Sequence, residues 1–383
     1  MFNGMLIMLM GAASMVILAV GAGAADGVEP DSFDRSWPIV VGHYPHYAVN
    51  SLPIASIPYD KLSHIGYFSL SPMANGDLDE INVDVADLQE LVARADAHGV
   101  KTFITVGGWG ASEHFSAMAA NLYARINFAA RLAQYCLDYN LDGADLDWEP
   151  VSTETDKTNY SLLVGQVHDE FESLGLGLTV SVCAYGDEIT PETIALVDWL
   201  NIMAYDNTPP HHSTFDSAVS ALDHWENYGA PREKAVLGVP FYGKTAAGAS
   251  CTYKLIVEFY HPGPEVDYVA GIGFNGINTI KRKTQYVLDN GYRGVMTWEL
   301  SQDAAGGSSL LTAIRDTIVA TSPANFNGDY RVDLSDFSIL GFAWQSHPND
   351  DNWNQVCDIS TPRDNVINQH DLAVFCGYWL AGL

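Results

Sequence analysis

The sequence of 383 residues predicts an α/β protein: a (β/α)8 barrel of the TIM type, followed by a small helical domain. Two observations support this prediction. Short apolar runs rich in β-branched residues alternate with amphipathic stretches across residues 37–320, a pattern typical of parallel strands that are buried on both faces. Beyond Pro323 the chain carries Asn, Asp and Ser at short spacing, and this change in composition marks a second unit over residues 325–383.

The regular spacing of the apolar runs gives the order of elements. Strands are predicted over residues 39–44, 64–70, 102–106, 143–148, 178–184, 199–205, 235–241 and 294–298. Helices are predicted between them, over residues 84–98, 122–139, 158–174, 213–228, 277–290 and 309–320. Eight such units fit a closed barrel better than the alternative, an open doubly wound sheet.

Three acids occupy alternate positions at the end of the fourth predicted strand. Asp145, Asp147 and Glu149 are separated by single apolar residues, so their side chains share one face of a β-strand. Successive acids on that face lie about 6.5–7 Å apart along the backbone, close enough to perturb one another's ionisation. Crowded like charges do not stabilise a core, so we interpret these acids as catalytic. The alternative is a solvated edge strand, for which Leu146 and Trp148 are poor choices.

Other predicted strand ends also carry distinctive residues. In a barrel of this type, active sites form at the C-terminal ends of the strands. Flat aromatic rings match the apolar faces of pyranose sugars, so aromatics at several ends together predict a sugar-binding cleft, although each ring alone would more often be core packing. The residues at these ends are Tyr44, Gly107, Gly108, Trp109, Met203, Tyr205, Asp206, Phe241, Tyr242, Trp298 and Glu299.

Residues 142–149 match the DGxDxDxE signature of the family 18 glycoside hydrolases, the chitinases and their relatives. Residues 105–108 resemble the family's SxGG strand, residues 203–206 its MxYD strand, residues 294–299 its final strand and residues 40–44 its first. The resemblance spans about residues 37–320. Thr105 stands where the family usually has serine, and this change keeps a hydroxyl group.

The resemblance implies a role for each matched residue. Glu149 would protonate the glycosidic oxygen and later activate water, with Asp147 keeping it protonated by repulsion. Asp147 would orient the substrate's 2-acetamido group, the nucleophile in this family, and Asp145 would hold or share the proton of Asp147. Tyr205 would donate to the acetamido carbonyl, and Trp298 would lie under the sugar in the −1 subsite. Further substrate contacts are expected from Met203, Asp206, Tyr44, Gly108 and Trp109.

Two expectations concern the surroundings of these acids. Asp142 has the opposite parity to the other three, so we expect it to fix the start of the strand rather than to contact substrate. The segment between the seventh and eighth predicted strands, residues 242–293, is predicted to be too short for the additional α+β insertion that deepens the groove in processive members of the family. An open, shallower cleft is therefore expected.

The C-terminal unit contains an internal repeat of two oxygen-rich loops, each before an apolar helix. The repeat resembles a dockerin, which implies Ca²⁺ binding and, as partner, a cohesin domain on another protein or a cell surface. The alternative is a polar linker with capped helices. The first loop would bind through Asn325, Asn327, Asp329, the Arg331 carbonyl, Asp333 and Asp336, and the looser second loop through Asp364, Asn368 and Asp371, joined by Asp358 or Ser360.

Charge and the N-terminal segment bear on partners and location. The net charge of −29 argues against nucleic acid or an anionic membrane as a partner, because both attract basic surfaces. The apolar run 5–20 and the small residues 21–25 predict a signal peptide over residues 1–25, and a secreted or extracellular protein without stable membrane insertion. A membrane anchor is the alternative, since no Lys or Arg precedes Arg35.

The five cysteines do not form an obvious disulfide framework. Cys136 and Cys183 fall in apolar contexts and are predicted to be buried thiols. Cys357 and Cys376 flank one short unit and could pair in an oxidising compartment, and the sequence leaves this open.

The function predicted from these features is that of an endo-acting chitinase. It would cleave the β-1,4 bonds of N-acetylglucosamine polymers with retention of configuration, and no cofactor is expected for catalysis. Two alternatives stay open. An endo-β-N-acetylglucosaminidase acting on N-glycans uses the same motif, whereas a chitinase-like lectin typically lacks the acid that Glu149 supplies here.

Overall fold

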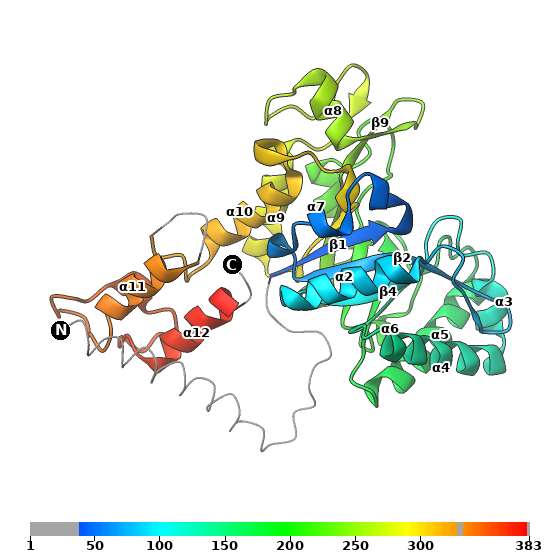
Figure 1. The fold of residues 1–383 in the computed structure, drawn as a ribbon, viewed down its shortest axis with the longest axis horizontal. Coiled ribbons are helices and arrows are strands. Elements are labelled where there is room, and N and C mark those ends of the chain that lie inside the picture. The colour runs from blue at the N-terminus through cyan, green and yellow to red at the C-terminus, as the bar shows by residue number, and fades with distance from the viewer. Residues whose placement is uncertain (1–37, 328–331, 381–383) are drawn as a thin grey trace.

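Eight parallel strands form a closed barrel surrounded by helices (Figure 1). The computed structural model describes residues 38–327 and 332–380. Strand β1 pairs in parallel with both β2 and β13, so the barrel sheet closes on itself and the alternative open sheet is wrong. In chain order the barrel strands are β1 (Ile39–Pro45), β2 (His64–Pro72), β4 (Lys101–Gly107), β5 (Gly143–Asp147), β6 (Gly177–Cys183), β7 (Trp199–Met203), β8 (Ala235–Pro240) and β13 (Gly294–Trp298).

The strand boundaries follow the apolar runs to within two residues. This agreement has a physical cause: parallel strands that are covered on both faces must be apolar along their whole length, so the run and the strand coincide. Every residue of β1, β5 and β8 is buried. The predicted signal peptide, residues 1–25, lies outside the described residues. Among the described helices, none has the length and apolar character needed to cross a membrane.

Helices α2 (Val85–Ala97), α4 (Leu122–Asp138), α5 (Glu154–Glu172), α7 (Phe215–Tyr228), α9 (Ile277–Asn290) and α10 (Leu310–Thr321) correspond to the six predicted helices. Helix α5 begins four residues earlier than predicted. Thr153 explains this start, because its hydroxyl accepts a hydrogen bond from the Asp156 N–H, and Glu154 adds a second acid to the first turn. Two short helices, α3 (Phe115–Ala120) and α6 (Pro191–Ile194), were not predicted.

The interior of the barrel is filled by large side chains from alternate strand positions. Phe103 on β4 and Trp199 on β7 are fully buried there, in a cluster completed by Ile39, Val41, Val236 and Met296. Gly66 on β2 makes room for the Phe103 ring, since a Cβ at residue 66 would lie 2.4 Å from it. A larger apolar layer between the strands and the helices forms the main core.

The segment between β8 and β13 does fold as an α+β insertion, so the prediction that it is too short for one is wrong. It contains β9 (Tyr242–Thr245), β10 (Ser250–Thr252), α8 (Tyr253–Tyr260), β11 (Tyr268–Val269) and β12 (Ile272–Gly273). The four strands form a separate antiparallel sheet in the order β10-β9-β12-β11. Figure 1 shows this insertion beyond one end of the barrel. Strands of two to four residues suffice because each is paired within a compact hairpin arrangement.

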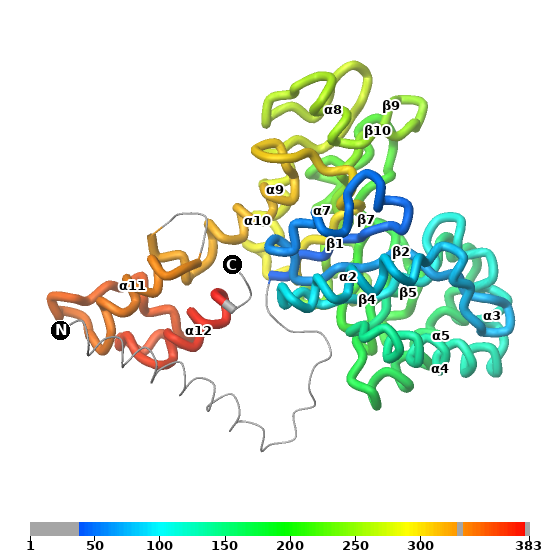
Figure 2. Tube along the Cα trace, in the orientation of Figure 1, coloured from blue at the N-terminus to red at the C-terminus, as the bar shows by residue number. Residues whose placement is uncertain are grey.

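The C-terminal unit has its own small core and two helices, α11 (Leu334–Phe342) and α12 (Gln369–Leu380). Figure 2 follows the chain from α10 into this unit. Phe337 of α11 and Phe375 of α12 have ring centroids 5.8 Å apart, so the helices pack on each other. The buried core comprises Ala324, Val332, Leu340, Ala343, Cys357, Ile359, Ile367 and Phe375.

All five cysteines are free thiols in the structure. Cys136 is buried as predicted, but Cys183 is exposed, so that part of the prediction is wrong. Cys183 ends β6, and its side chain reaches the mouth of the barrel instead of the core. Cys357 and Cys376 are not joined by a disulfide.

The packing inside the barrel predicts the effect of removing one of its buried aromatic rings. Phe103→Ala deletes a fully buried ring from a closed interior that cannot collapse, and should lower the free energy of unfolding by about 3–5 kcal/mol in urea titrations. Tyr123→Ala is the control, because this ring is 81% exposed and its loss should cost less than about 0.5 kcal/mol. Equal costs would contradict the assignment of Phe103 to the core.

Candidate active site

The acids of the motif lie in a row on β5, from the barrel interior toward its mouth. Asp145 is 0% exposed, Asp147 is 5% exposed, and Glu149, two residues past the strand end, is half-buried. Asp142 lies at the opposite end of β5, where its carboxylate accepts a hydrogen bond of 2.7 Å from the Thr102 N–H. The prediction that Asp142 fixes the start of the strand is therefore confirmed.

Asp145 is surrounded by hydrogen-bond donors from the two next strands. Its Oδ1 accepts from Thr179 Oγ1 at 2.8 Å and from Asn201 Nδ2 at 3.2 Å, and its Oδ2 accepts from Ser181 Oγ at 2.9 Å. Thr179 and Ser181 alternate along β6, so both point into the barrel. Burial raises the pKa of Asp145 to about 6, and these donors limit the rise because they stabilise the charged form.

Asp147 has the least hydrogen bonding of the three acids. Its side chain is buried, and among the described residues Oδ1 has no hydrogen-bond partner. Burial raises the pKa of Asp147 well above its ordinary value, and the charges of Glu149, Asp145 and Glu188 raise it further. Without donors to stabilise a carboxylate, Asp147 favours its protonated form.

The chain at the end of β4 fits closely over the end of β5 because Gly107 and Gly108 are adjacent glycines. The Gly108 N–H donates to the Asp147 carbonyl at 2.6 Å. Gly107 has a φ of +103°, and a Cβ there would lie 2.2 Å from the same carbonyl oxygen. Gly108 has a φ of +89°, and its Cβ would meet the Phe68 ring at 2.1 Å. The glycine pair therefore sets how closely the loop approaches the acids.

Glu149 is held at the barrel mouth by the same loop. The backbone N–H of Glu149 donates to Ser112 Oγ at 3.0 Å, and the backbone N–H of Trp109 donates to the Glu149 carboxylate. Burial raises the pKa of Glu149 to about 7, and the charges of Asp206 and Glu188 contribute after it. Repulsion from Asp147 was predicted to keep Glu149 protonated. The repulsion is found on Asp147 instead, because the charge of Glu149 raises the pKa of Asp147. The Trp109 ring itself is 81% exposed beside this acid.

A cavity of about 410 Å³ opens beside Glu149 at the ends of β5, β6 and β7. Tyr205 and Met203 line it, as predicted for neighbours of the reacting sugar. Burial raises the pKa of Tyr205 well above its ordinary value, so its hydroxyl remains a donor at neutral pH. The full lining is Glu149, Val151, Cys183, Ala184, Tyr185, Gly186, Asp187, Glu188, Met203, Tyr205, Asp206 and Asn207.

Asp206 is a fixed, ionised acid at the edge of this cavity. It forms an ion pair with Lys244 at 2.7 Å and accepts a hydrogen bond from the Tyr242 hydroxyl. His212 Nδ1 lies 3.4 Å from the same carboxylate oxygen. Burial alone would raise the pKa of Asp206, but its contacts with His212, Lys244 and Tyr242 bring the pKa down to about 2.

The aromatic residues predicted at the strand ends divide by the face on which they lie. Trp298 is half-buried at the mouth, where its ring lies 4.7 Å from that of Phe68 and 5.7 Å from that of His43. Tyr44 is fully buried on the other face of β1, and its hydroxyl donates to the Leu52 carbonyl at 2.8 Å. The prediction that Tyr44 contacts substrate is therefore wrong, because a one-residue change of parity turns it away from the cleft.

Four residues near the acids were not predicted as site residues: Glu188, His212, Tyr242 and Lys244. Tyr242 and Lys244 belong to β9 of the unpredicted insertion, and His212 lies in the loop before α7. Glu188 follows β6, and its Oε1 accepts from the Cys183 N–H at 2.9 Å. Only Tyr242 had a signal in the sequence, as one of the aromatics at a strand end.

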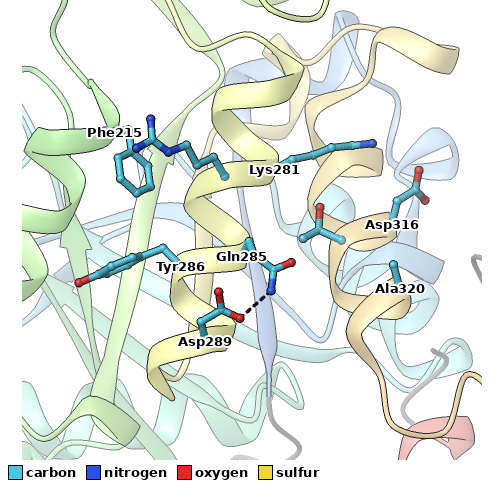
Figure 3. A pocket seen from close by; sticks show the side chains of 9 residues that line it. Phe215, Lys281, Gln285, Tyr286, Asp289, Asp316 and Ala320 are labelled. Carbon is cyan, nitrogen blue, oxygen red and sulfur yellow. Dashed lines mark hydrogen bonds between the residues drawn. The ribbon is translucent and has the colours of Figure 1, made fainter.

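A larger hollow, about 520 Å³, lies on the outer surface of the barrel (Figure 3). It is formed by side chains of α7, α9 and α10, including Phe215, Lys281 and Asp316. Its polar groups are largely paired with one another: Gln285 donates to Asp289 at 2.7 Å, and the Arg282 guanidinium stacks over the Phe215 ring. None of the strand ends contributes to it, so the cavity beside Glu149 remains the candidate site.

In the C-terminal unit, the last acid of each predicted calcium loop closes the loop onto its helix. Asp336 accepts from the N–H groups of Asn327 and Asp333, and Asp333 in turn caps α11. Asp371 accepts from the N–H groups of Ile359, Ser360 and Asn368. The side chain of Asn325 donates to the Val319 carbonyl. Asp329 and Arg331 lie outside the described residues.

The second loop brings three carboxylates together. Oxygen atoms of Asp358, Asp364 and Asp371 lie within 4.8 Å of one another. Asp358 is 1% exposed and Ser360 is 6% exposed, and Asp358 Oδ1 and Ser360 Oγ have no hydrogen-bond partner among the described residues. Asn368 does not point its oxygen at this cluster, since Oδ1 accepts from the His370 N–H and Nδ2 donates to Asp364.

Comparison with known proteins agrees with the geometry. The family model described as glycosyl hydrolases family 18 matches residues 39–303. Chitinase A1 of Niallia circulans is 29% identical over 285 residues, and Endochitinase 1 of Metarhizium robertsii is 25% identical over 344 residues. The match to Chitinase A1 covers 53% of this chain and 41% of that protein, so the chain spans less than half of it. The match to Endochitinase 1 covers 69% of this chain and 81% of that protein.

A solved structure with a similar fold is that of the GH18 chitinase ChiB from the chitin utilization locus of Flavobacterium johnsoniae. It superposes with a TM-score of 0.67 and 27% identity, covering 74% of this chain and 95% of that chain. The chitinase RmChi1 from Rhizomucor miehei gives a TM-score of 0.64 at 26% identity, covering 73% of this chain and 99% of that chain.

The close fit of the β4 loop predicts a difference between two glycines of the same loop. Gly107→Ala places a Cβ against the Asp147 carbonyl, and should lower the free energy of unfolding by more than about 2 kcal/mol in urea titrations. Gly110→Ala is the matched control: its φ is +86°, but a Cβ there meets nothing within 4 Å, so only backbone strain of about 1–2 kcal/mol is expected. A cost for Gly107→Ala no larger than that of the control would contradict the proposed fit.

Proposed function

The chain belongs to glycosyl hydrolases family 18 and is a glycoside hydrolase, and on this premise we propose that it cleaves the β-1,4 bonds of N-acetylglucosamine polymers such as chitin. The observation that carries the proposal is the row of acids in which the innermost, Asp145, accepts three hydrogen bonds, whereas Oδ1 of the next, Asp147, has no partner among the described residues. Asp145, Asp147 and Glu149 thereby differ in proton affinity along one strand. The names of the relatives, chitinases and endochitinases, support chitin as the substrate.

The proposed reaction uses the substrate's own 2-acetamido group as nucleophile. Glu149 gives its proton to the glycosidic oxygen as the bond to the anomeric carbon breaks. The acetamido carbonyl oxygen bonds to that carbon from the opposite face, and a cyclic oxazolinium ion forms. Asp147 passes its proton to Asp145 as the ion forms, so that its carboxylate orients the acetamido N–H and stabilises the positive charge. The Tyr205 hydroxyl donates to the acetamido oxygen. Ionised Glu149 then takes a proton from water, which attacks the anomeric carbon and restores the original configuration.

Retention follows from two inversions at the same carbon, so the first product is the β-anomer. The general acid must enter the cycle protonated. Burial raises the pKa of Glu149 to about 7, so its protonated fraction, and with it kcat/KM, should fall as the pH rises through about 7. The half-exposed Trp298 offers a flat surface for the sugar, and the exposed Trp109 offers a second one at the rim.

The first test replaces the proposed acid. Glu149→Gln keeps the shape but cannot donate a proton, so release of a chromophore from an aryl chitobioside should fall by about 10²–10⁴-fold or more, with binding to chitin retained. Glu192→Gln, an exposed acid on α6, is the control and should keep wild-type activity. Undiminished turnover by Glu149→Gln would exclude it as the acid, and preferential release of glycan from a high-mannose glycopeptide would point instead to an endo-β-N-acetylglucosaminidase.

We also propose that the C-terminal unit is a dockerin-like module that binds Ca²⁺ in its second loop. Asp358, Asp364, Asp371 and Ser360 provide the hard oxygen ligands that calcium prefers. The buried, unpartnered Asp358 Oδ1 and Ser360 Oγ support this, because a buried oxygen without a partner costs free energy that a cation would recover. Calcium there would neutralise the crowded carboxylates and stabilise the loop that leads into α12.

A cohesin domain is the proposed partner of this module. Leu334 and Phe342 of α11 support a docking surface, since they are 67% and 73% exposed. The apolar segment 5–20 supports secretion, which would place the enzyme outside the cell or, through a cohesin, at a cell surface.

The calcium proposal predicts a metal-dependent stability of the full chain. Binding of Ca²⁺ at about millimolar concentration should raise the unfolding temperature of the C-terminal unit relative to EDTA, followed by tryptophan fluorescence, with stoichiometric uptake in isothermal titration calorimetry. Asp358→Asn should abolish both effects. Asp351→Asn removes an exposed acid outside the cluster and should leave them intact. No calcium binding by the wild type would exclude the site.

A further inference from the structure

A fourth acid, Glu188, is buried in the wall of the active-site cavity and has no counter-ion in the part of the chain that the structure describes. Glu188 is only 8% exposed, and its Oε2 has no hydrogen-bond partner among the described residues. The other oxygen accepts from the Cys183 N–H at 2.9 Å, and the weakly donating Cys183 thiol lies against the carboxylate. An unpaired buried carboxylate is expensive to keep, so its presence needs a reason.

The cations nearest to the cavity are engaged with other acids. Lys157 pairs with Asp187 at 2.6 Å, and Lys244 pairs with Asp206 at 2.7 Å. Within the described chain, Glu188 forms no ion pair. Titratable groups from the surrounding elements face Glu188. Those from the strands and their ends are Asp147 and Glu149 (β5), Cys183 (β6), and Tyr205 and Asp206 (β7). Those from the helices and from its own loop are Lys157 and Tyr160 (α5), His224 (α7, hydrogen-bonded to the Gly186 carbonyl), Tyr185 and Asp187.

A purely structural role does not require the charge of Glu188. The loop is shaped to receive the side chain, since a Cβ at Gly186 would lie 2.1 Å from Oε2. The hydrogen bond to the Cys183 N–H ties the loop to β6. A glutamine would fit the same space and accept the same hydrogen bond without burying a charge. What remains to be explained is the negative charge itself.

We propose that Glu188 is a positioning residue whose negative charge helps Asp147 and Glu149 to retain their protons, and so extends activity to higher pH. This inference rests on the proposed glycosidase mechanism. Asp206 also faces Glu149 and raises its pKa more than Glu188 does, but Asp206 is ion-paired with Lys244, whereas Glu188 forms no ion pair with the residues that the structure describes. Burial is the largest cause of the raised pKa of both Asp147 and Glu149, and the charge of Glu188 adds to it at both residues. Glu188 acts on them through space and does not touch the reacting atoms.

The test compares the pH dependence of kcat/KM for Glu188→Gln and the wild type on a soluble chitin oligosaccharide. Loss of the charge should move the alkaline limb down by about 0.5–1 pH unit and leave kcat/KM on the acidic side within about threefold. Glu188→Asp keeps the charge and should return the limb to within about 0.3 unit of the wild type. Glu192→Gln, which removes an exposed acid from α6, should leave the limb in place.

Three results would overturn the inference: an unmoved alkaline limb in Glu188→Gln, a uniform loss of activity at all pH values, or a failure of Glu188→Asp to restore the limb. A wild-type protein inactive on chitin oligosaccharides would instead contradict the proposed function. In that case ¹³C NMR titration of the Glu149 carboxyl still decides the matter. Its apparent pKa must be lower in Glu188→Gln than in the wild type.

Discussion

Three carboxylates on one buried face of a strand cannot all be ionised, and the structure around β5 is arranged by this constraint. In a medium of low polarity each charge raises the proton affinity of the next. The hydrogen-bond donors decide where the charge resides. Asp145 receives three of them from β6 and β7, whereas Asp147 Oδ1 receives none, so the charge is favoured on Asp145 and the proton on Asp147. Glu149, nearer the solvent, can exchange its proton.

The barrel supplies what such an arrangement needs. Thr179, Ser181 and Asn201 reach Asp145 because parallel strands of a closed barrel place their inward residues in layers. The β4 loop covers the other end, and its two glycines let the backbone lie directly on the Asp147 carbonyl. Packing on both sides therefore fixes the acids, so the side chains cannot move apart to reduce the free-energy cost of their mutual repulsion.

The sequence predicts the barrel well because its signals are local. Apolar runs coincide with buried strands, and the period of two separates Asp142 from the other acids, with the outcome that the structure confirms. Parity also explains the failures. Tyr44 was chosen because it is aromatic and near a strand end, yet the preceding residue, His43, is the one that faces Trp298. Cys183 is the last residue of β6, and its position at the mouth exposes it.

The insertion could not be predicted for a different reason. Its strands are two to four residues long, too short for a periodic pattern, and their pairing depends on contacts between distant hairpins. Yet this part of the chain reaches the site, because β9 provides both Tyr242 and Lys244 to Asp206. Asp206 is half exposed and paired with Lys244, so it keeps a constant charge. Glu188 is buried and forms no ion pair among the described residues, so no cation offsets its charge. The two flanking acids therefore differ electrostatically because of a segment whose fold depends on tertiary contacts, and a motif of eight residues cannot report that difference.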